Sequence, residues 1–296
     1  MKPPPFRYHD PRTVADAVAL LARLDNVKLL AGGQSLMPML NMRFVQPDHV
    51  IDLNRVEGLS FIHEANGTLE IGGMTRQRDL EFSNLVAARC PLMGEAIQLV
   101  GHRQTRNRGT LGGSLCHLDP SAELVSVAAT LDATVTVHGP NGQREIAFAE
   151  FPVAFMTPAI EPNELLTAVR FPLWPKDHGF AFVEFARRHG DFAIVSAAVL
   201  ITEDGGGRIS RAAITIGGLG MVPIRAVEVE QALVGHVPDD NLLREACEAC
   251  RKLDAIDDVH APASYRQHLA AVLSRRALEK AYARLTGKDV STAKTH

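Results

Sequence analysis

Val27-Lys-Leu-Leu-Ala-Gly-Gly-Gln-Ser-Leu36 runs from an apolar, extended stretch into two glycines and then a hydroxyl residue. Thr110-Leu-Gly-Gly-Ser114 repeats the arrangement farther along the chain. Glycine adopts backbone angles that a Cβ forbids and places no side chain between backbone and ligand. Several N–H groups can therefore face one concavity and bind a phosphate, and two such loops suit the linked phosphates of a dinucleotide. Either loop alone is better explained as a tight turn at the end of a strand.

The composition is that of an ordinary soluble globular protein, with 296 residues, 46% hydrophobic and 22% charged. That length has room for two or three domains. A net charge of −3 gives no indication of nucleic acid or of an anionic membrane as a partner. The N-terminus has no apolar signal core, and no run is long enough for a membrane span. We therefore expect a cytoplasmic protein.

The cysteines and histidines do not predict a metal centre. Cys247 and Cys250 have the spacing of metal ligands, but they lack a second pair and lie in a helical pattern with Leu243 and Ala246. We expect both thiols to pack in a core. The twelve histidines form no recognisable ligand motif. This chain is thus expected to hold no metal, neither an iron–sulfur cluster nor a structural zinc.

The first part of the chain predicts a small α/β lobe. A helix over 13–24, capped by Thr13 with Asp16, precedes a strand over 27–31, a short helix over 36–40 and a strand over 49–53. The first glycine loop then lies between a strand and a helix, where a phosphate gains from the helix N-terminus.

The next part predicts a second lobe. Asn66-Gly67 indicates a hairpin over 61–71, Thr75 can cap a helix over 77–82, and Pro91 breaks a helix over 85–100. The segment 102–108 is either a solvated loop or a source of positive charge near bound phosphates.

Asp119 precedes a helix predicted over 121–131, and helix capping explains it as well as ligand contact does. A hairpin over 134–148 and a strand over 164–171 lead to a proline-rich boundary. Beyond it we predict three antiparallel strands (180–187, 192–202, 209–216) and three helices (224–234, 239–254, 264–286).

The fold class predicted is α+β: a two-lobed domain followed by a C-terminal domain with a three-stranded antiparallel sheet and helices. We divide the chain into lobe 1 (1–57), lobe 2 (58–175), the C-terminal domain (176–289) and a tail (290–296).

Several motifs in order resemble the signatures of one family. They are Ala31-Gly-Gly-Gln-Ser-Leu36, Met74-Thr-Arg-Gln-Arg-Asp-Leu80, Thr110-Leu-Gly-Gly-Ser114, Asp119-Pro-Ser-Ala-Glu-Leu124, Gly190-Asp-Phe-Ala-Ile-Val195 and Tyr265-Arg-Gln-His-Leu-Ala270. Together they resemble the FAD subunits of molybdenum hydroxylases, the family of the carbon monoxide dehydrogenase medium chain and the flavin domain of xanthine dehydrogenase. The resemblance covers nearly the whole chain.

The resemblance implies an FAD domain of the vanillyl-alcohol-oxidase type, and an oxidoreductase subunit without catalytic residues of its own. It implies a small partner subunit with [2Fe–2S] clusters and a large one with the molybdenum cofactor, in a dimer of heterotrimers. Electrons would pass from the clusters through FAD to an external acceptor. No histidine or cysteine occupies an obvious attachment site, so we expect noncovalent FAD.

The resemblance also implies roles for individual residues. The two glycine segments wrap the pyrophosphate, Val100 and Leu166 pack against the cofactor, Glu123 bonds its hydroxyl-rich linker, and Thr75 and the Asp191 region lie near the ring. The predicted cofactor contacts are Leu29, Leu30, Ala31, Gly32, Gly33, Gln34, Ser35, Leu36, Thr75, Val100, Thr110, Leu111, Gly112, Gly113, Ser114, Asp119, Glu123, Leu166 and Asp191.

One position departs from the family. The family's lysine before the Gly-Asp-Phe-Ala motif has no obvious counterpart in Glu184-Phe-Ala-Arg-Arg188. Arg187 or Arg188 could supply a positive charge, but neither is assigned that role. Since charge near the ring tunes flavin potential, the acceptor stays open, as does the substrate of the whole enzyme.

Two other functions are compatible with the sequence. The chain could be a self-contained flavin reductase or oxidase, in which case it would turn over a small substrate alone. It could also be a binding module that has lost its flavin, although both glycine segments are intact. If the flavin is bound, a β-branched residue at Gly32 or Gly112 should abolish its retention and leave the fold mostly intact.

Overall fold

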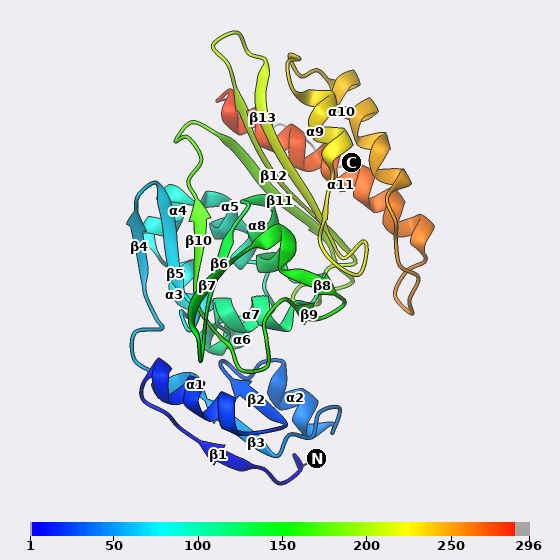
Figure 1. The fold of residues 1–296 in the computed structure, drawn as a ribbon. Helices are drawn as coiled ribbons and strands as arrows, with labels where there is room; N and C mark the ends of the chain where they lie inside the picture. The colour runs from blue at the N-terminus through cyan, green and yellow to red at the C-terminus, as the bar shows by residue number, and fades with distance from the viewer. Residues whose placement is uncertain (1, 288–296) are drawn as a thin grey trace.

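Four β-sheets organise residues 2–287, which are the residues that the computed structural model describes (Figure 1). The predicted tail at 290–296 lies outside them. The α+β class is confirmed: a small parallel sheet, a larger antiparallel sheet and a C-terminal antiparallel sheet follow one another along the chain, each with its own helices. The fourth sheet is a two-stranded ribbon over 152–158.

The N-terminal lobe is a three-stranded parallel sheet in the order β1-β3-β2. Thr13 caps its first helix as predicted, because its Oγ1 accepts a hydrogen bond from the Asp16 N–H at 3.1 Å. Ala17 and Leu21 of that helix pack on Ile51 of the central strand. The sequence did not predict the first strand. The elements are β1 (Arg7–His9), α1 (Val14–Arg23), β2 (Val27–Leu30), α2 (Leu36–Asn41), β3 (His49–Asp52) and the 3-10 turn η1 (Leu53–Arg55).

The second lobe is a five-stranded antiparallel sheet in the order β4-β5-β10-β6-β7, covered by short helices. Its first hairpin turns at Asn66-Gly67, as predicted, and both residues have positive φ. The elements are β4 (Ile62–Ala65), β5 (Thr68–Gly72), α3 (Gln77–Glu81), α4 (Asn84–Arg89), α5 (Pro91–Ile97), α6 (Arg103–Arg108), α7 (Leu111–His117), α8 (Glu123–Thr130), β6 (Thr134–Gly139), β7 (Gly142–Ala147), η2 (Phe148–Glu150), β8 (Pro152–Ala154), β9 (Thr157–Pro158) and β10 (Leu165–Pro172).

Two segments predicted as loops are helical. The basic segment forms helix α6, and the second glycine segment is the first turn of helix α7. Thr110 is the N-cap of α7, and its Oγ1 accepts from the Gly113 N–H at 3.0 Å. The cap explains why two glycines do not prevent the helix. It gives a partner to the Gly113 N–H, one of the first-turn donors that have no acceptor within the helix.

Two predicted helix caps are wrong. Thr75 does not cap α3, because its hydroxyl is hydrogen-bonded to the backbone N–H and C=O of Phe61 and is buried. Asp119 does not cap α8, which begins later, at Glu123. Asp119 Oδ1 instead accepts from the Ser121 N–H at 2.9 Å in an Asx turn.

The C-terminal sheet has the order β11-β12-β13-β14, so the predicted three strands gain a fourth, β14, at the start of what was predicted as a helix. Helices α5 and α8 of the second lobe pack on one face of this sheet, and α9 and α11 pack on the other (Figure 1). Burial on both faces explains the nearly continuous apolar sequence of β12. The elements are β11 (Gly179–Phe185), β12 (Val195–Glu203), β13 (Ile209–Gly217), β14 (Ile224–Arg225), α9 (Val227–Leu233), α10 (Asp240–Cys247), η3 (Glu248–Lys252) and α11 (Ala263–Leu285).

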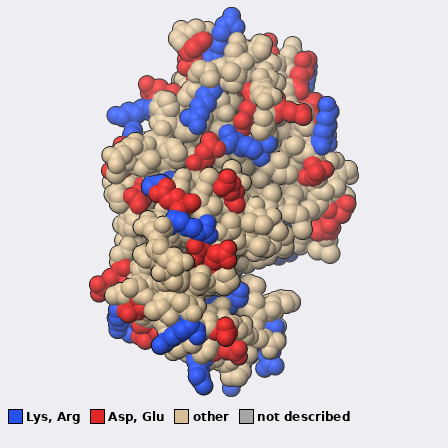
Figure 2. Space-filling model, in the orientation of Figure 1, with Lys and Arg blue, Asp and Glu red and all other residues tan. Residues whose placement is uncertain are grey.

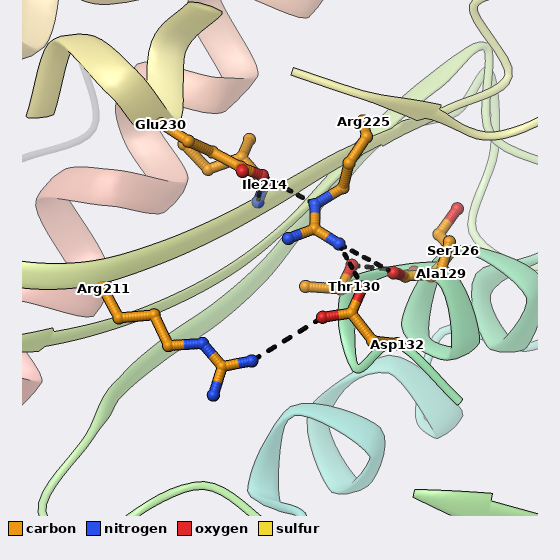
Figure 3. A network of polar contacts seen from close by, with 8 residues as sticks. All are labelled: Ser126, Ala129, Thr130, Asp132, Arg211, Ile214, Arg225 and Glu230. Atoms are coloured by element: carbon orange, nitrogen blue, oxygen red, sulfur yellow. Dashed lines mark hydrogen bonds and ion pairs between the residues drawn. The ribbon is translucent and has the colours of Figure 1, made fainter. Parts of the chain in front are cut away.

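A polar network fastens helix α8 to this sheet (Figure 3). The Arg225 guanidinium donates to Asp132 and Glu230, at 2.6 Å each, and to the carbonyl of Ala129. Glu230 also accepts from the Ile214 N–H of β13. One arginine thus joins the end of α8, strand β13 and helix α9.

Candidate functional site

A cavity of about 580 Å³ lies where the N-terminal lobe meets the second lobe, a volume ordinary for cofactor sites. The molecular surface is notched at this junction, and acidic and basic side chains are interspersed over the visible face (Figure 2). Most of the predicted cofactor contacts line this cavity: Leu29, Ala31, Gly32, Gly33, Gln34, Ser35, Leu36, Val100, Thr110, Gly112, Gly113, Ser114, Asp119, Glu123 and Leu166.

The first glycine segment offers backbone donors to the cavity. The N–H groups of Gly32, Gly33, Gln34 and Ser35 donate to no acceptor on the described residues. Gly33 has a φ of +72°, which turns the chain from β2 into α2. Since unpaired N–H groups at a cavity wall need an acceptor from outside the chain or water, this segment fits an anionic ligand.

The second glycine segment has its donors already occupied. The N–H groups of Leu111 and Gly112 donate to the carbonyls of Thr75 and Gly73, and those of Gly113 and Ser114 donate to Thr110. At Gly112 and Gly113 this segment presents a surface without side chains to the cavity. It also presents the hydroxyl of Ser114, which has no hydrogen-bond partner on the described residues.

The arginines of α6 do not line the cavity. Arg106 is buried and pairs with both carboxylate oxygens of Glu81, at 2.9 and 3.0 Å. Only Thr105 of this helix reaches the cavity, together with Gly109 just after it. The prediction of positive charge near the phosphates from this segment is therefore not supported, and Lys28 is the lysine or arginine that lines the cavity among the described residues.

Arg76 holds the two lobes together beside the cavity, and sequence reasoning gave it no role. Its guanidinium donates to the carbonyl of Arg108 and to Asn54 Oδ1, while Asn54 Nδ2 donates to the carbonyl of Ala31 at 3.0 Å. At the same junction, a Cβ on Gly32 would lie 2.2 Å from the Arg108 carbonyl oxygen. The backbones of the two lobes touch here, and Arg76 braces the contact.

This close approach corrects the expected effect of substitutions at the glycines. A Cβ on Gly112 would likewise lie 2.6 Å from the Gly73 carbonyl oxygen. Because both obstructions are backbone atoms, a β-branched residue at either site would displace the chain. Loss of flavin from such variants would not by itself identify a phosphate contact.

The inner wall of the cavity carries titratable groups. Cys116, His117 and Asp119 line the cavity around Leu118, the C-cap of α7, which has a left-handed conformation with φ of 52°. Burial lowers the pKa of His117 and raises the pKa of the Cys116 thiol to about 12. Neither residue was among the predicted cofactor contacts. The raised pKa keeps the thiol protonated and weakly nucleophilic.

Glu123 is almost fully buried at this wall, and among the described residues its carboxylate has no hydrogen-bond partner outside its own residue. Burial, together with the charges of Glu184 and Asp119, raises its pKa to about 8. A buried carboxyl at a cavity wall with a strongly perturbed pKa is a mark of a functional position.

Four predicted contacts do not line the cavity: Leu30, Thr75, Leu111 and Asp191. Asp191 instead lies 3.7 Å from Arg187 in an exposed ion pair. The neighbouring Phe192, which is 57% exposed, reaches the cavity from the C-terminal domain. Gln77 was also missed; it lines the cavity and its Oε1 is buried without a hydrogen-bond partner. The signal for Gln77 in the sequence was its place as a polar residue at the start of a short predicted helix.

The cavity suits a dinucleotide of the FAD type. The unpaired N–H groups of the first glycine segment can receive phosphate oxygens, and Ser35 and Ser114 add hydroxyls. Apolar side chains that can pack on flat rings complete the wall, among them Leu29, Leu36 and Leu166. Within 2–287 no cluster of three or more metal-ligating side chains occurs, and no helix is long and apolar enough to cross a membrane.

Comparisons with known proteins agree with this geometry. Residues 4–174 match the FAD binding domain in molybdopterin dehydrogenase, and residues 180–281 match the CO dehydrogenase flavoprotein C-terminal domain. The chain is 41% identical to subunit alpha of the 6-hydroxypseudooxynicotine dehydrogenase complex of Paenarthrobacter nicotinovorans, over 95% of this chain and 96% of that one. It is 37% identical to the carbon monoxide dehydrogenase medium chain of Afipia carboxidovorans, over 96% and 99%.

Solved structures share the fold over nearly their whole length. A chain of carbon monoxide dehydrogenase from Hydrogenophaga pseudoflava superposes with a TM-score of 0.93 at 37% identity, covering 96% of this chain and 99% of that one. A chain of quinoline 2-oxidoreductase from Pseudomonas putida 86 superposes with a TM-score of 0.92 at 33% identity, covering 97% and 99%. The chain therefore belongs to the family of FAD-binding medium subunits of molybdenum-containing dehydrogenases.

Proposed function

We propose that this chain carries electrons through a bound FAD, from the [2Fe–2S] clusters of a small partner subunit to an external acceptor. A large partner subunit would oxidise the substrate at a molybdenum cofactor. The observation that carries the proposal is a cavity with unpaired backbone donors in a chain without a metal-ligand cluster among its described residues. FAD would supply the two-electron chemistry, and the chain would bind, orient and shield it.

The cofactor contacts at the cavity follow from what each group can donate. The N–H groups of Gly32 to Ser35 would bind the pyrophosphate, and Gly112 and Gly113 would let it approach helix α7 closely. Glu123 would bond the hydroxyls of the linker, and Val100 and Leu166 would pack against the cofactor. Thr75 and the Asp191 region would lie near the flavin ring without lining the cavity.

The finer organisation is also part of the proposal. We propose noncovalent FAD, since the Cys116 thiol at the wall is held protonated, and assembly as a dimer of heterotrimers in the cytoplasm. The division into 1–57, 58–175 and 176–289 is supported by hydrophobic clusters centred on each part, although the second cluster includes Phe182 and Leu200 of the C-terminal sheet.

The proposal is tested by the visible absorption of the purified chain, alone and with its two partner subunits. We expect bound FAD that acid denaturation releases in full, no turnover by the chain alone, and substrate-driven bleaching of the flavin in the complex. Turnover of a small substrate by the isolated chain would establish a self-contained flavoenzyme instead. Failure to bind FAD both alone and in the complex would refute the flavin assignment.

A further inference from the structure

A row of polar groups runs from the cavity wall into the interface between helix α8 and the C-terminal sheet. On the sheet, Glu184 of β11 pairs with Ser196 of β12, which pairs with Gly217 of β13. On the helix, Glu123 and Ser126 are three residues apart and so lie on one side of α8. The two rows face each other, because a Cβ on Gly217 would lie 2.3 Å from Ser126 Oγ and 2.6 Å from Ser196 Oγ.

These groups are buried and short of partners. Ser126 and Ser196 are 0% exposed, and neither hydroxyl has a hydrogen-bond partner within residues 2–287. Glu184 is partly exposed as a residue, but its Oε2 is buried and also unpartnered. Unpaired polar atoms in a domain interface carry a cost in stability. A buried carboxyl costs less when it binds a proton, because the neutral form loses less hydration than the charged form.

Among residues 2–287, no lysine or arginine forms an ion pair with either carboxyl. Burial raises the pKa of Glu184 to about 7, and the Glu184 charge contributes to raising that of Glu123. Asp119 adds negative charge from the cavity side, and burial lowers the pKa of His117, which therefore favours the neutral form.

The cations on neighbouring elements are engaged elsewhere. On α11, Lys280 and Arg284 pair with Glu95 of α5. The buried Arg266, also on α11, donates to the carbonyls of Ile194 and Gly218 and pairs with Asp258 at 2.7 Å. At the far end of α8, Arg225 pairs with Asp132 and Glu230. The inward face of β12 and β13 offers the hydroxyls of Ser196 and Thr215.

We propose that Glu123, on the inner wall of the cavity, and Glu184, on the adjoining sheet, form a proton-binding site that takes up a proton from solvent when an anionic group enters the cavity. A carboxylate oxygen of the pair gains the proton, and the site then holds one negative charge fewer. The added negative charge raises the proton affinity of the pair, because like charges in a buried site disfavour a second ionised group. The anionic group is FAD if the proposed function holds.

The test is calorimetric titration of the full chain with FAD, at a pH near 8, in two buffers of different ionisation enthalpy. We expect the wild type to take up a fraction of a proton per FAD bound. E184Q and E123Q should each lose most of this uptake, whereas E203Q, an exposed carboxyl on the same strand β12, should keep it. The site is refuted if the wild type exchanges no proton or releases one, or if E184Q takes up as much as the wild type.

A second measurement decides the inference even if FAD does not bind. A carboxyl whose pKa is raised on folding stabilises the chain fully below its unfolded pKa of about 4.3, and this contribution is lost as the pH rises through the folded value. The free energy of unfolding of the wild type should therefore fall from acid toward pH 8 more steeply than that of E184Q. Equal pH dependence in wild type, E184Q and E203Q would overturn the proton site independently of the flavin.

Discussion

The two glycine segments read alike in sequence and differ in structure. Gly32 and Gly33 lie in an open loop whose N–H groups are unpaired, whereas Gly112 and Gly113 lie in the first turn of a capped helix whose N–H groups are bonded within the chain. The first segment can bind an anion through its backbone, and the second can let one approach closely. The same short motif thus serves two physical purposes, and the residues before it determine which: a strand end in one case and an N-cap threonine in the other.

The largest effect is expected from breaking the contact between the lobes. In G32V the new side chain would meet the backbone of Arg108 and Gly109, so the lobes must separate, and we expect a loss of stability of about 3 kcal/mol together with loss of FAD. Denaturant unfolding and flavin absorption measure the two effects. The control is G94A, where a Cβ meets nothing within 4 Å; a comparable loss there would contradict the explanation.

The brace at the same junction should have the next largest effect. R76Q removes the charged donors to the Arg108 carbonyl and to Asn54, and we expect a loss of about 2 kcal/mol. Binding of FAD should weaken with it, since the first glycine segment loses its fixed position. R103Q on helix α6 removes an exposed arginine whose side chain makes no hydrogen bond to the described residues, and its stability should match the wild type. If R76Q were as stable as R103Q, the brace would have no energetic role.

A smaller effect tests the second segment. T110A removes the acceptor of the Gly113 N–H, and the loss of a helix cap costs about 1 kcal/mol. T110S keeps the hydroxyl and should restore most of the stability. Hydrogen exchange at Gly113 should accelerate in T110A and not in T110S. Unchanged exchange in T110A would show that the cap does not hold the first turn of α7.

The smallest effect is expected from Q34A, which tests whether the backbone or the Gln34 side chain of the first glycine segment binds the phosphates. Gln34 is exposed, and its Nε2 donates to the Gly32 carbonyl at 3.0 Å. If the backbone N–H groups bind the phosphates, Q34A should change stability by less than about 0.5 kcal/mol and FAD affinity by less than about threefold. If Q34A lost as much FAD affinity as G32V, the Gln34 side chain and not the backbone would bind the phosphates.

Local sequence patterns predicted the elements whose cause is local. The cap at Thr13, the hairpin at Asn66-Gly67 and the helix break at Pro91 follow from neighbouring residues alone, and each is present. The prediction failed at Thr75 and Asp119. Both are plausible caps by spacing, but a backbone distant in sequence takes the Thr75 hydroxyl, and an Asx turn takes the Asp119 carboxylate.

The sequence predicted those site residues that are close together in the chain, and it missed those that depend on contacts between distant elements. Most residues read from motifs line the cavity, because a motif records consecutive positions. The sequence assigned no role to four residues that act through another element. Arg76 bonds the Arg108 carbonyl and Glu184 acts on Glu123, while Gln77 and Phe192 reach the cavity from their own elements. Such relations depend on how the lobes pack and leave no periodic signature.

The C-terminal sheet, covered by helices on both faces, has a consequence for synthesis of the chain. This sheet covers apolar side chains of α5 and α8, which belong to the domain that is synthesised first. The nascent first domain therefore exposes these side chains until the C-terminal strands have been synthesised. Cutting the gene in the proline-rich connection after Pro172 would leave that exposure permanent. The two halves matched by separate family models should therefore be produced as one polypeptide or co-expressed, and either half alone should aggregate or recruit chaperones.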